Sequence, residues 1–283
     1  DCGGAGGFPL EGLVEGEGVA FGKTEGEVVG DTGSNDLVAS GPDAPDQADF
    51  HAEAIAPHQQ QSGDAGFKVG VRSDGGLVEL GHRLGALLDL RTAPGDGVVL
   101  QSPVFTDFKP LVVSAGCSVV KNPLTLDGHR YEMDLEGLEE AASEPATTAM
   151  ILCNPHNPVG RSWTRDDLAE VARICAAHDV FVIADEIHAD LTLPGHTFTP
   201  FAEVAPDSGW AALHGPIKTF GLAGVCDTLL ITSDAGVADE YRAMSGRLHL
   251  TRNNVFSLAA FEAAYAEAGE WVDELLGIVG RNY

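Results

Sequence analysis

The sequence predicts an α/β protein with a mostly parallel central sheet, and three observations support this prediction. Apolar runs that stop at polar turns recur beyond residue 91, as expected of buried strands. Segments with apolar residues at intervals of three and four, typical of amphipathic helices, separate several of these runs. Polar clusters directly follow two of the apolar runs, and open α/β sheets place their ligands at such carboxyl ends of strands.

Residues 150–190 form the clearest unit of this pattern. Residues 150–152 are a short apolar run that stops at an Asn-Pro pair, which predicts a buried strand followed by a turn. Thr164 is a suitable N-cap for the helix expected next, because its hydroxyl can accept from a free N–H group. One face of that helix is apolar, at Leu168, Val171, Ala172 and Cys175. A second apolar run, residues 180–184, predicts a strand that ends at Asp185 and completes a β-α-β unit.

Periodicity places further elements on both sides of this unit. Leucines at helical spacing predict a helix over residues 77–90, and a strand is expected at residues 98–100 after a turn. The pattern also predicts strands over residues 111–120, with a break at residues 115–116, and over residues 229–232. It predicts helices over residues 134–142 and 257–280, the last with a weak point at Gly269, and a helix that begins with residues 239–244. Strands and helices thus alternate along the chain, which indicates a sheet covered by helices.

The composition disfavours several classes of partner. The 283 residues include 16 basic and 43 acidic side chains, which gives a net charge of −27 at pH 7. Such a charge argues against nucleic acid and anionic membranes, because both attract basic surfaces. The sequence holds no apolar run of about eighteen residues, so no membrane-spanning helix is expected. The five cysteines are odd in number and unclustered, which indicates buried thiols and predicts a cytoplasmic protein.

Residues 1–90 differ in composition from the rest of the chain. They hold 19 of the 35 glycines and neither Trp nor Tyr. Residues 16–22 contain several glycines, but their spacing does not match a phosphate-binding loop and no convincing strand precedes them. Residues 43–66 are polar and predict a loop or a disordered segment. We therefore expect a Gly-rich segment of undefined structure over residues 1–90 and a separate domain over residues 91–283.

Three motifs in this second part carry candidate chemistry. Asn157-Pro158-Val159-Gly160 follows the first strand of the β-α-β unit, and Asp185-Glu186-Ile187-His188 follows the second. Lys218 lies about thirty residues later, in a small and apolar setting. A lysine that forms a Schiff base needs partial desolvation, because desolvation lowers its pKa and frees its lone pair.

Together, Asn-Pro-x-Gly, Asp-Glu-Ile-His and Lys-Thr-Phe resemble the motifs of fold-type I pyridoxal 5′-phosphate (PLP) enzymes of the class I/II aminotransferase superfamily. Within it the sequence resembles the cystathionine β-lyase (C–S lyase) branch, which carries His in the second motif where many aminotransferases carry Tyr. The resemblance extends over residues 92–283. It implies a three-layer fold-type I large domain that is incomplete at its carboxyl end, with the small domain largely missing.

The resemblance also implies roles for five residues. Lys218 would hold PLP as a Schiff base and, once the substrate displaces it, would remove the Cα proton. Asp185 would lie beside the ring nitrogen and favour its protonated form. The amide of Asn157 would hold the phenolic oxygen of the ring as an anion, and His188 would contact the same oxygen. Phe105 would stack on the ring.

Each assignment has a plainer alternative. Asp185 and Glu186 taken alone are also consistent with the start of a solvated loop. A single histidine such as His188 is commonly structural, and Phe105 could be an ordinary core aromatic. A metal centre is not expected, because no metal-site template matches the spacing of Asp185, His188, Asp190 and His196.

The implied activity is that of a PLP-dependent carbon–sulfur β-lyase. Such an enzyme would cleave cystathionine-like or cysteine S-conjugate amino acids to pyruvate, ammonia and a thiol. One alternative is a class I/II aminotransferase, because the same residues serve both reactions, and another is a non-catalytic or truncated relative. The resemblance further implies a homodimer that acts on a small-molecule amino acid.

Several positions depart from the family pattern. Gly215 stands three residues before the lysine, where the family usually has a Ser or Thr that binds phosphate. Residues 225–228 replace a Gly-Tyr-like pair, and neither the Gly-rich phosphate loop nor the tyrosine that reaches the partner subunit is identifiable. The arginine that binds the substrate carboxylate would lie beyond Tyr283. We therefore expect this chain, as given, to be a weak enzyme or none.

Overall fold

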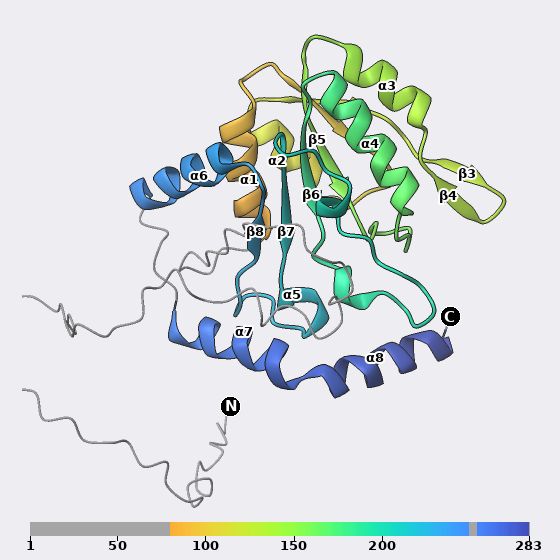
Figure 1. The fold of residues 1–283 in the computed structure, drawn as a ribbon, viewed down its shortest axis with the longest axis vertical. Helices are drawn as coiled ribbons and strands as arrows, with labels where there is room; N and C mark the ends of the chain where they lie inside the picture. The colour runs from red at the N-terminus through yellow and green to blue at the C-terminus, as the bar shows by residue number, and fades with distance from the viewer. Residues whose placement is uncertain (1–79, 249–253, 283) are drawn as a thin grey trace, which may run out of the picture. The chain divides into compact units, whose positions relative to one another are not determined.

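The computed structural model describes residues 80–248 and 254–282 (Figure 1). Within these ranges a six-stranded sheet has the order β2-β1-β5-β6-β7-β8. Neighbouring strands are parallel, except that β7 and β8 are antiparallel. The strands are β1 (Gly97–Leu100), β2 (Ser118–Lys121), β5 (Thr147–Cys153), β6 (Phe181–Asp185), β7 (Trp210–His214) and β8 (Leu229–Ile231). The predicted α/β class with a mostly parallel sheet is confirmed.

Helices cover both faces of this sheet (Figure 1). Alternate residues of β5 enter two cores, with Met150 and Leu152 on one face and Ala149 and Ile151 on the other. This alternation follows from the period of two along a strand and produces three layers. The first face carries α3 (Leu135–Ser143) and α4 (Arg165–Ala177), and the second carries α1 (Leu80–Arg91), α2 (Phe108–Ser114) and α6 (Ala235–Arg247).

Helix α4 begins as the sequence predicts. The hydroxyl of Thr164 accepts from the N–H of Asp167 at 3.1 Å, and the Asp167 carboxylate accepts from the N–H of Thr164 at 3.0 Å. This capping box satisfies N–H groups that the helix cannot bond internally. All four residues predicted on the apolar face of α4 are buried.

The predicted strand over residues 111–120 is wrong, because its first part belongs to helix α2 and only its last part to strand β2. The β-branched pair Val112 and Val113 favours a strand locally. Phe108 and Val112, however, lie four residues apart and are fully buried together on one helical face. Pro110 lies in the first helical turn, where its missing N–H is tolerated. Packing against the sheet therefore overrides the local preference.

A β-hairpin that the sequence analysis missed precedes α3. Strands β3 (Thr125–Asp127) and β4 (Arg130–Glu132) are antiparallel, with Asp127 opposite Arg130. Gly128 in the connecting turn has a φ of +61°, a conformation that favours glycine. The Asp-Gly pair at the start of this turn is the sequence signal that predicts a hairpin.

The remaining described elements follow β6. They are η2 (Ala189–Leu191), η3 (Phe201–Glu203), α5 (Pro216–Thr219), α7 (Val255–Glu267) and α8 (Gly269–Asn282). Helices α7 and α8 are separated at Ala268, beside the weak point predicted at Gly269. Among the helices of the described ranges, none is long and apolar enough to cross a membrane. Features predicted within residues 1–79 lie outside the described residues, and the division at residue 90 stays a prediction.

Candidate functional site

The carboxyl ends of β5, β6 and β7 form one level edge. Cys153 of β5 pairs with Asp185 of β6, and Asp185 pairs with Leu213 of β7. The ladder continues one step further, because the N–H of Asn154 donates to the Asp185 carbonyl and the N–H of Glu186 donates to the Leu213 carbonyl, each at 2.9 Å. Each predicted motif follows one of these strands, so the sheet brings all three motifs to a single edge.

Asp185 ends β6 as a buried carboxylate that is 3% exposed. Its Oδ1 accepts a hydrogen bond from the N–H of Ile187 at 3.2 Å. Burial raises the pKa of Asp185 to about 6, although the Ile187 N–H and the positive charge of Lys218 act in the opposite direction. Because burial disfavours the charged form, this carboxylate would be stabilised by a further cationic partner.

Lys218 lies on α5, the single helical turn that follows β7. Its neighbours Ile217 and Thr219 are buried, but Lys218 itself is exposed. The sequence predicts a partly desolvated side chain at Lys218, and this prediction is wrong for the structure formed by the described residues. The turn buries the side chains on either side of Lys218 and leaves the lysine side chain exposed to solvent. The exposed amine still acts electrostatically on the edge, because its charge lowers the pKa of His188 and opposes the increase at Asp185.

Gly215 stands where the family pattern has Ser or Thr, and the space around it is tight. A Cβ atom at this position would lie 3.0 Å from the carbonyl oxygen of Asp227 and 3.2 Å from Cα of Thr228. Both are backbone atoms, so a larger residue would displace the neighbouring segment. The close approach of this segment accounts for the missing hydroxyl.

Asn157 and His188 line a cavity of about 960 Å³ beside the edge, and both residues are half-buried. Burial, followed by the charge of Lys218, lowers the pKa of His188, so its imidazole is neutral near pH 7. The N–H of Asn157 donates to Sγ of Cys153 at 3.4 Å, which holds the turn against the end of β5. These positions suit the predicted roles of the two residues, which stay predictions.

Phe105 lies in the loop between β1 and α2 and is half-buried. Its ring packs edge-to-face against Phe108, with centroids 5.5 Å apart and planes at 82°. The same ring packs against the core beneath α1 and α2. Phe105 thus has the contacts of a core aromatic, and its stacking on a cofactor stays a prediction.

Asn154 and Glu186 connect the edge to the surrounding loops, a role that the sequence analysis missed. Nδ2 of Asn154 donates to the Thr199 carbonyl at 3.0 Å, and its Oδ1 accepts from the N–H of Trp163 at 3.1 Å. Oε1 of Glu186 accepts from the N–H of Phe201 at 2.6 Å. Their position directly after buried strands is the sequence signal that could have identified both residues.

A polar cluster lies beside the lysine turn. Oδ2 of Asp190 accepts from the Thr219 hydroxyl at 3.3 Å and from the Tyr265 hydroxyl at 3.2 Å. The same Tyr265 oxygen lies 3.2 Å from Nε2 of His214. Burial, followed by the charge of Asp190, raises the pKa of Tyr265, so the phenol stays protonated. The cluster ties β7, α5 and α7 to the loop after β6.

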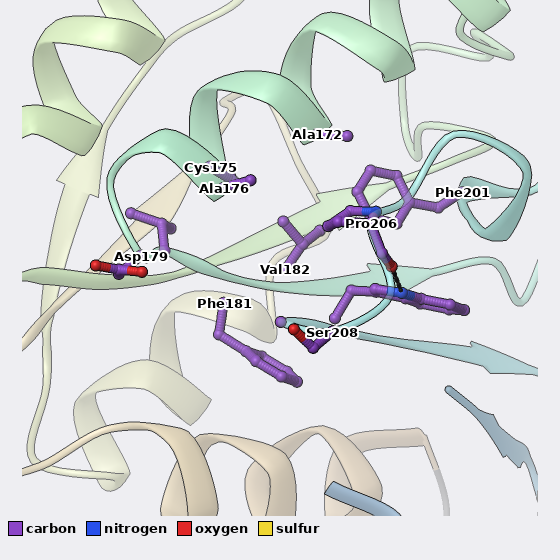
Figure 2. Close-up of a pocket in the computed structure, with 12 residues that line it drawn as sticks. Ala172, Cys175, Ala176, Asp179, Phe181, Val182, Phe201, Pro206 and Ser208 are labelled. Carbon is purple, nitrogen blue, oxygen red and sulfur yellow. Dashed lines mark hydrogen bonds between the residues drawn. The ribbon is translucent and has the colours of Figure 1, made fainter. Parts of the chain in front are cut away.

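A second and smaller cavity, of about 220 Å³, lies at the opposite end of β6 (Figure 2). Its lining includes Phe181 and Val182 of β6, Cys175 of α4, and Phe201. The predicted site residues do not line it. In the described part of the chain, the structure forms no group of three or more His, Cys, Asp or Glu side chains that could hold a metal ion.

Comparison with known proteins identifies the family. The family model for aminotransferase class I and II matches residues 81–276. This chain belongs to that family. The cystathionine β-lyase PatB of Bacillus subtilis (strain 168) is 42% identical over 193 residues, which are 68% of this chain and 50% of PatB. The chain spans about half the length of the curated relatives it matches.

Two solved structures have folds similar to the fold of this chain. Cystalysin from Treponema denticola, which contains a PLP cofactor, matches with a TM-score of 0.70 at 25% identity, covering 75% of this chain and 54% of cystalysin. A PLP-bound putative aminotransferase from Clostridium difficile 630 matches with a TM-score of 0.69 at 32% identity, covering 72% of this chain and 53% of that protein. These matches confirm the predicted fold-type I architecture.

Proposed function

We propose that this chain belongs to a PLP-dependent carbon–sulfur β-lyase that acts on cystathionine-like or other cysteine S-conjugate amino acids. The products would be pyruvate, ammonia and a thiol. The observation that carries the proposal is the placement of buried Asp185 and accessible Lys218 at one sheet edge, where the charge of Lys218 acts on Asp185. The 42% identity to PatB supports the choice of the lyase branch.

The residues of the edge fit PLP at its ring and at its aldehyde. Asp185 is a buried carboxylate whose pKa is raised by burial, and a protonated ring nitrogen would supply the cationic partner that this setting favours. The amine of Lys218 is exposed and therefore accessible to the aldehyde of PLP, but the described residues do not supply the desolvation that would free its lone pair. Gly215 offers no hydroxyl to a phosphate group, so the phosphate would depend on other donors.

When bound, PLP supplies an electron sink for the pair released at the substrate Cα. Lys218 would remove the Cα proton as a general base. Asp185 would hold the proton on the ring nitrogen through a charge-assisted hydrogen bond. The side-chain amide of Asn157 would donate a hydrogen bond to the phenolic oxygen of PLP. The N–H group of the neutral His188 imidazole would donate a second hydrogen bond to the same oxygen.

An aminotransferase is the second candidate, because the named residues serve both reactions. The family model and the 32% identity to the putative aminotransferase from Clostridium difficile favour it. His188 in the second motif favours the lyase. Incubation with cystathionine separates the two, since a lyase forms pyruvate and ammonia without an added keto acid. A homodimer and a cytoplasmic location belong to the same proposal.

Cofactor attachment tests the proposal on the chain itself. Adding PLP should produce a visible absorption band, and borohydride reduction followed by peptide mass spectrometry should locate the attached group at Lys218. Lys218→Ala should lose both signals. Lys109→Ala, at an exposed position on α2, is the matched control and should keep them. An unchanged band in Lys218→Ala would exclude Lys218 as the point of attachment.

A further inference from the structure

The loops that follow β1 and β5 leave the sheet at the same edge. The two strands are parallel neighbours, and Leu100 at the end of β1 pairs with Ile151 of β5. The loop after β1 carries Phe105, which is predicted to stack on the face of the PLP ring, and the loop after β5 carries Asn157, which is predicted to donate to the phenolic oxygen. The separation of these two loops therefore sets where the ring would lie.

His156 joins the two loops with a hydrogen bond. It directly precedes Asn157, and its Nε2 lies 2.9 Å from the carbonyl oxygen of Pro103, two residues before Phe105. A carbonyl oxygen only accepts, so Nε2 carries the hydrogen and donates it. Burial lowers the pKa of His156, although nearby backbone carbonyl groups act in the opposite direction, so the imidazole is neutral near pH 7.

Packing and backbone hydrogen bonds fix the position of His156. The residue is only 1% exposed, and its ring packs edge-to-face against Trp163, with centroids 5.5 Å apart and planes at 85°. Its N–H donates to the Arg161 carbonyl at 2.7 Å, and its carbonyl accepts from the N–H of Gly160 at 2.8 Å. These two bonds close the turn that carries Asn157, so the imidazole and the turn form one unit.

We infer that His156 is a positioning residue for the PLP ring, because its bond to Pro103 fixes the distance between Asn157 and Phe105. This inference rests on the proposed function, since the two residues contact a cofactor only if the edge binds PLP. His156 would touch neither the substrate nor the reacting atoms. It would act through its neighbours, by holding the donor at the edge of the ring in register with the aromatic side chain on its face.

Two substitutions separate this role from simple packing. His156→Phe keeps an aromatic ring beside Trp163 but removes the N–H group, which leaves the Pro103 carbonyl without its donor. His156→Gln removes the ring but keeps an N–H group at a similar distance from the backbone. The positioning role predicts that His156→Gln preserves the site and His156→Phe does not, whereas a packing role predicts the opposite order.

A PLP titration and the visible circular dichroism of bound PLP measure the effect without turnover. His156→Phe should bind PLP about tenfold more weakly, which corresponds to one hydrogen bond to a charged oxygen. Its dichroism at saturating PLP should also be weaker, because the ring is held less rigidly. His156→Gln should stay within about twofold of the unmodified chain in affinity and should keep the dichroism. His156→Asn has the same amide on a shorter side chain, should behave like His156→Phe, and replaces it if that variant does not fold.

His178→Phe is the matched control. Nε2 of His178 also forms a hydrogen bond, 2.6 Å from Oε1 of Glu139, but this histidine lies at the end of α4 and just before β6, away from the sheet edge. His178→Phe should change neither PLP affinity nor dichroism. Unchanged values in His156→Phe and His156→Asn would overturn the inference, as would a loss in His156→Gln that His156→Phe does not share.

Hydrogen exchange without PLP separates this inference from the proposed function. His156→Phe should speed exchange over residues 104–108, next to the lost bond, whereas His156→Gln should not. Equal PLP binding and equal dichroism in all these chains reject this inference alone. An unmodified chain that does not bind PLP rejects the proposed function and with it the role of His156 toward the ring, and faster exchange in His156→Phe would then assign the bond to Pro103 a purely structural role.

Discussion

The backbone N–H of Phe201 donates a 2.6 Å hydrogen bond to Oε1 of Glu186. Both residues are buried, and Glu186 is 3% exposed. Burial raises the pKa of Glu186 to about 8 against the effect of the Phe201 N–H, and the charges of Asp185 and Glu203 add to the increase. Glu186 is therefore mostly protonated near pH 7 and anchors the chain at η3 as a neutral acid.

We expect the free energy of unfolding to fall as the pH rises from about 4.5 to about 8. The folded state favours protonated Glu186, so its stabilising contribution is complete below the unfolded pKa and is lost as the pH passes through about 8. Glu186→Gln should flatten this part of the profile and raise stability at pH 8, because the amide oxygen still accepts from Phe201. Chemical denaturation at a series of pH values measures both effects.

Glu262→Gln is the matched control for this change, since Glu262 is exposed on α7. It should leave the pH dependence of unfolding as it is in the unmodified chain. A Glu186→Gln chain whose stability still falls as steeply with pH would contradict the protonated state of Glu186.

Tyr265→Phe tests the polar cluster at Asp190. The change keeps the ring contacts with Phe220 and Phe261 but removes the hydroxyl that lies 3.2 Å from both Asp190 and His214. We expect a loss of about 1–2 kcal/mol in the free energy of unfolding. A double-mutant cycle with Asp190→Asn should give a coupling of at least about 0.5 kcal/mol. Strictly additive losses would show that the two side chains do not interact.

Asn154→Ala tests the link between β5 and the cavity loops. The change removes the hydrogen bonds to Thr199 and Trp163 and leaves the N–H of Trp163 buried without its partner. We expect a loss of about 2–4 kcal/mol and faster hydrogen exchange over residues 192–200. Thr164→Ala is the control, because loss of the cap should cost about 1 kcal/mol without changing exchange in that loop. Unchanged exchange in Asn154→Ala would show that other contacts hold the loop.

The sequence predicts the sheet edge well because its signals there are local. Thr164 caps its helix through Asp167, three positions away, and the apolar runs that end before Asn154 and before Asp185 are continuous. Such patterns are short-range and survive without knowledge of the fold. The family motifs then lie at the ends of these strands, where the register of the sheet aligns them.

Structural features that depend on tertiary packing could not be predicted from the sequence. Helix α2 forms because Phe108 and Val112 fit the core together, against the β preference of the local residues. The exposure of Lys218 depends on how α5 leaves the sheet, and the bond from Phe201 to Glu186 joins residues fifteen positions apart. No local pattern encodes these contacts, so the structure is needed to find them.

Asp185→Asn should have opposite effects on stability and on PLP binding. Without PLP, the fold should gain on the order of 3 kcal/mol at pH 7, because the neutral amide avoids the cost of burying a charge whose pKa is raised from 3.8 to about 6. The amide oxygen still accepts from Ile187. PLP affinity should fall about tenfold to hundredfold, since an amide cannot form the charge-assisted pair with a protonated ring nitrogen.

Urea denaturation without PLP and a titration with PLP measure these two effects separately. The gain in stability should shrink as the pH falls from about 6 to 3.8 and should vanish below about pH 3, where the carboxyl group is protonated in both the folded and the unfolded chain. Asp273→Asn, at an exposed position on α8, should change neither quantity. A more stable Asp185→Asn chain with unchanged PLP affinity would reject the pairing with the ring nitrogen. A less stable one would mean that the ionised carboxylate already has a partner in the unliganded fold.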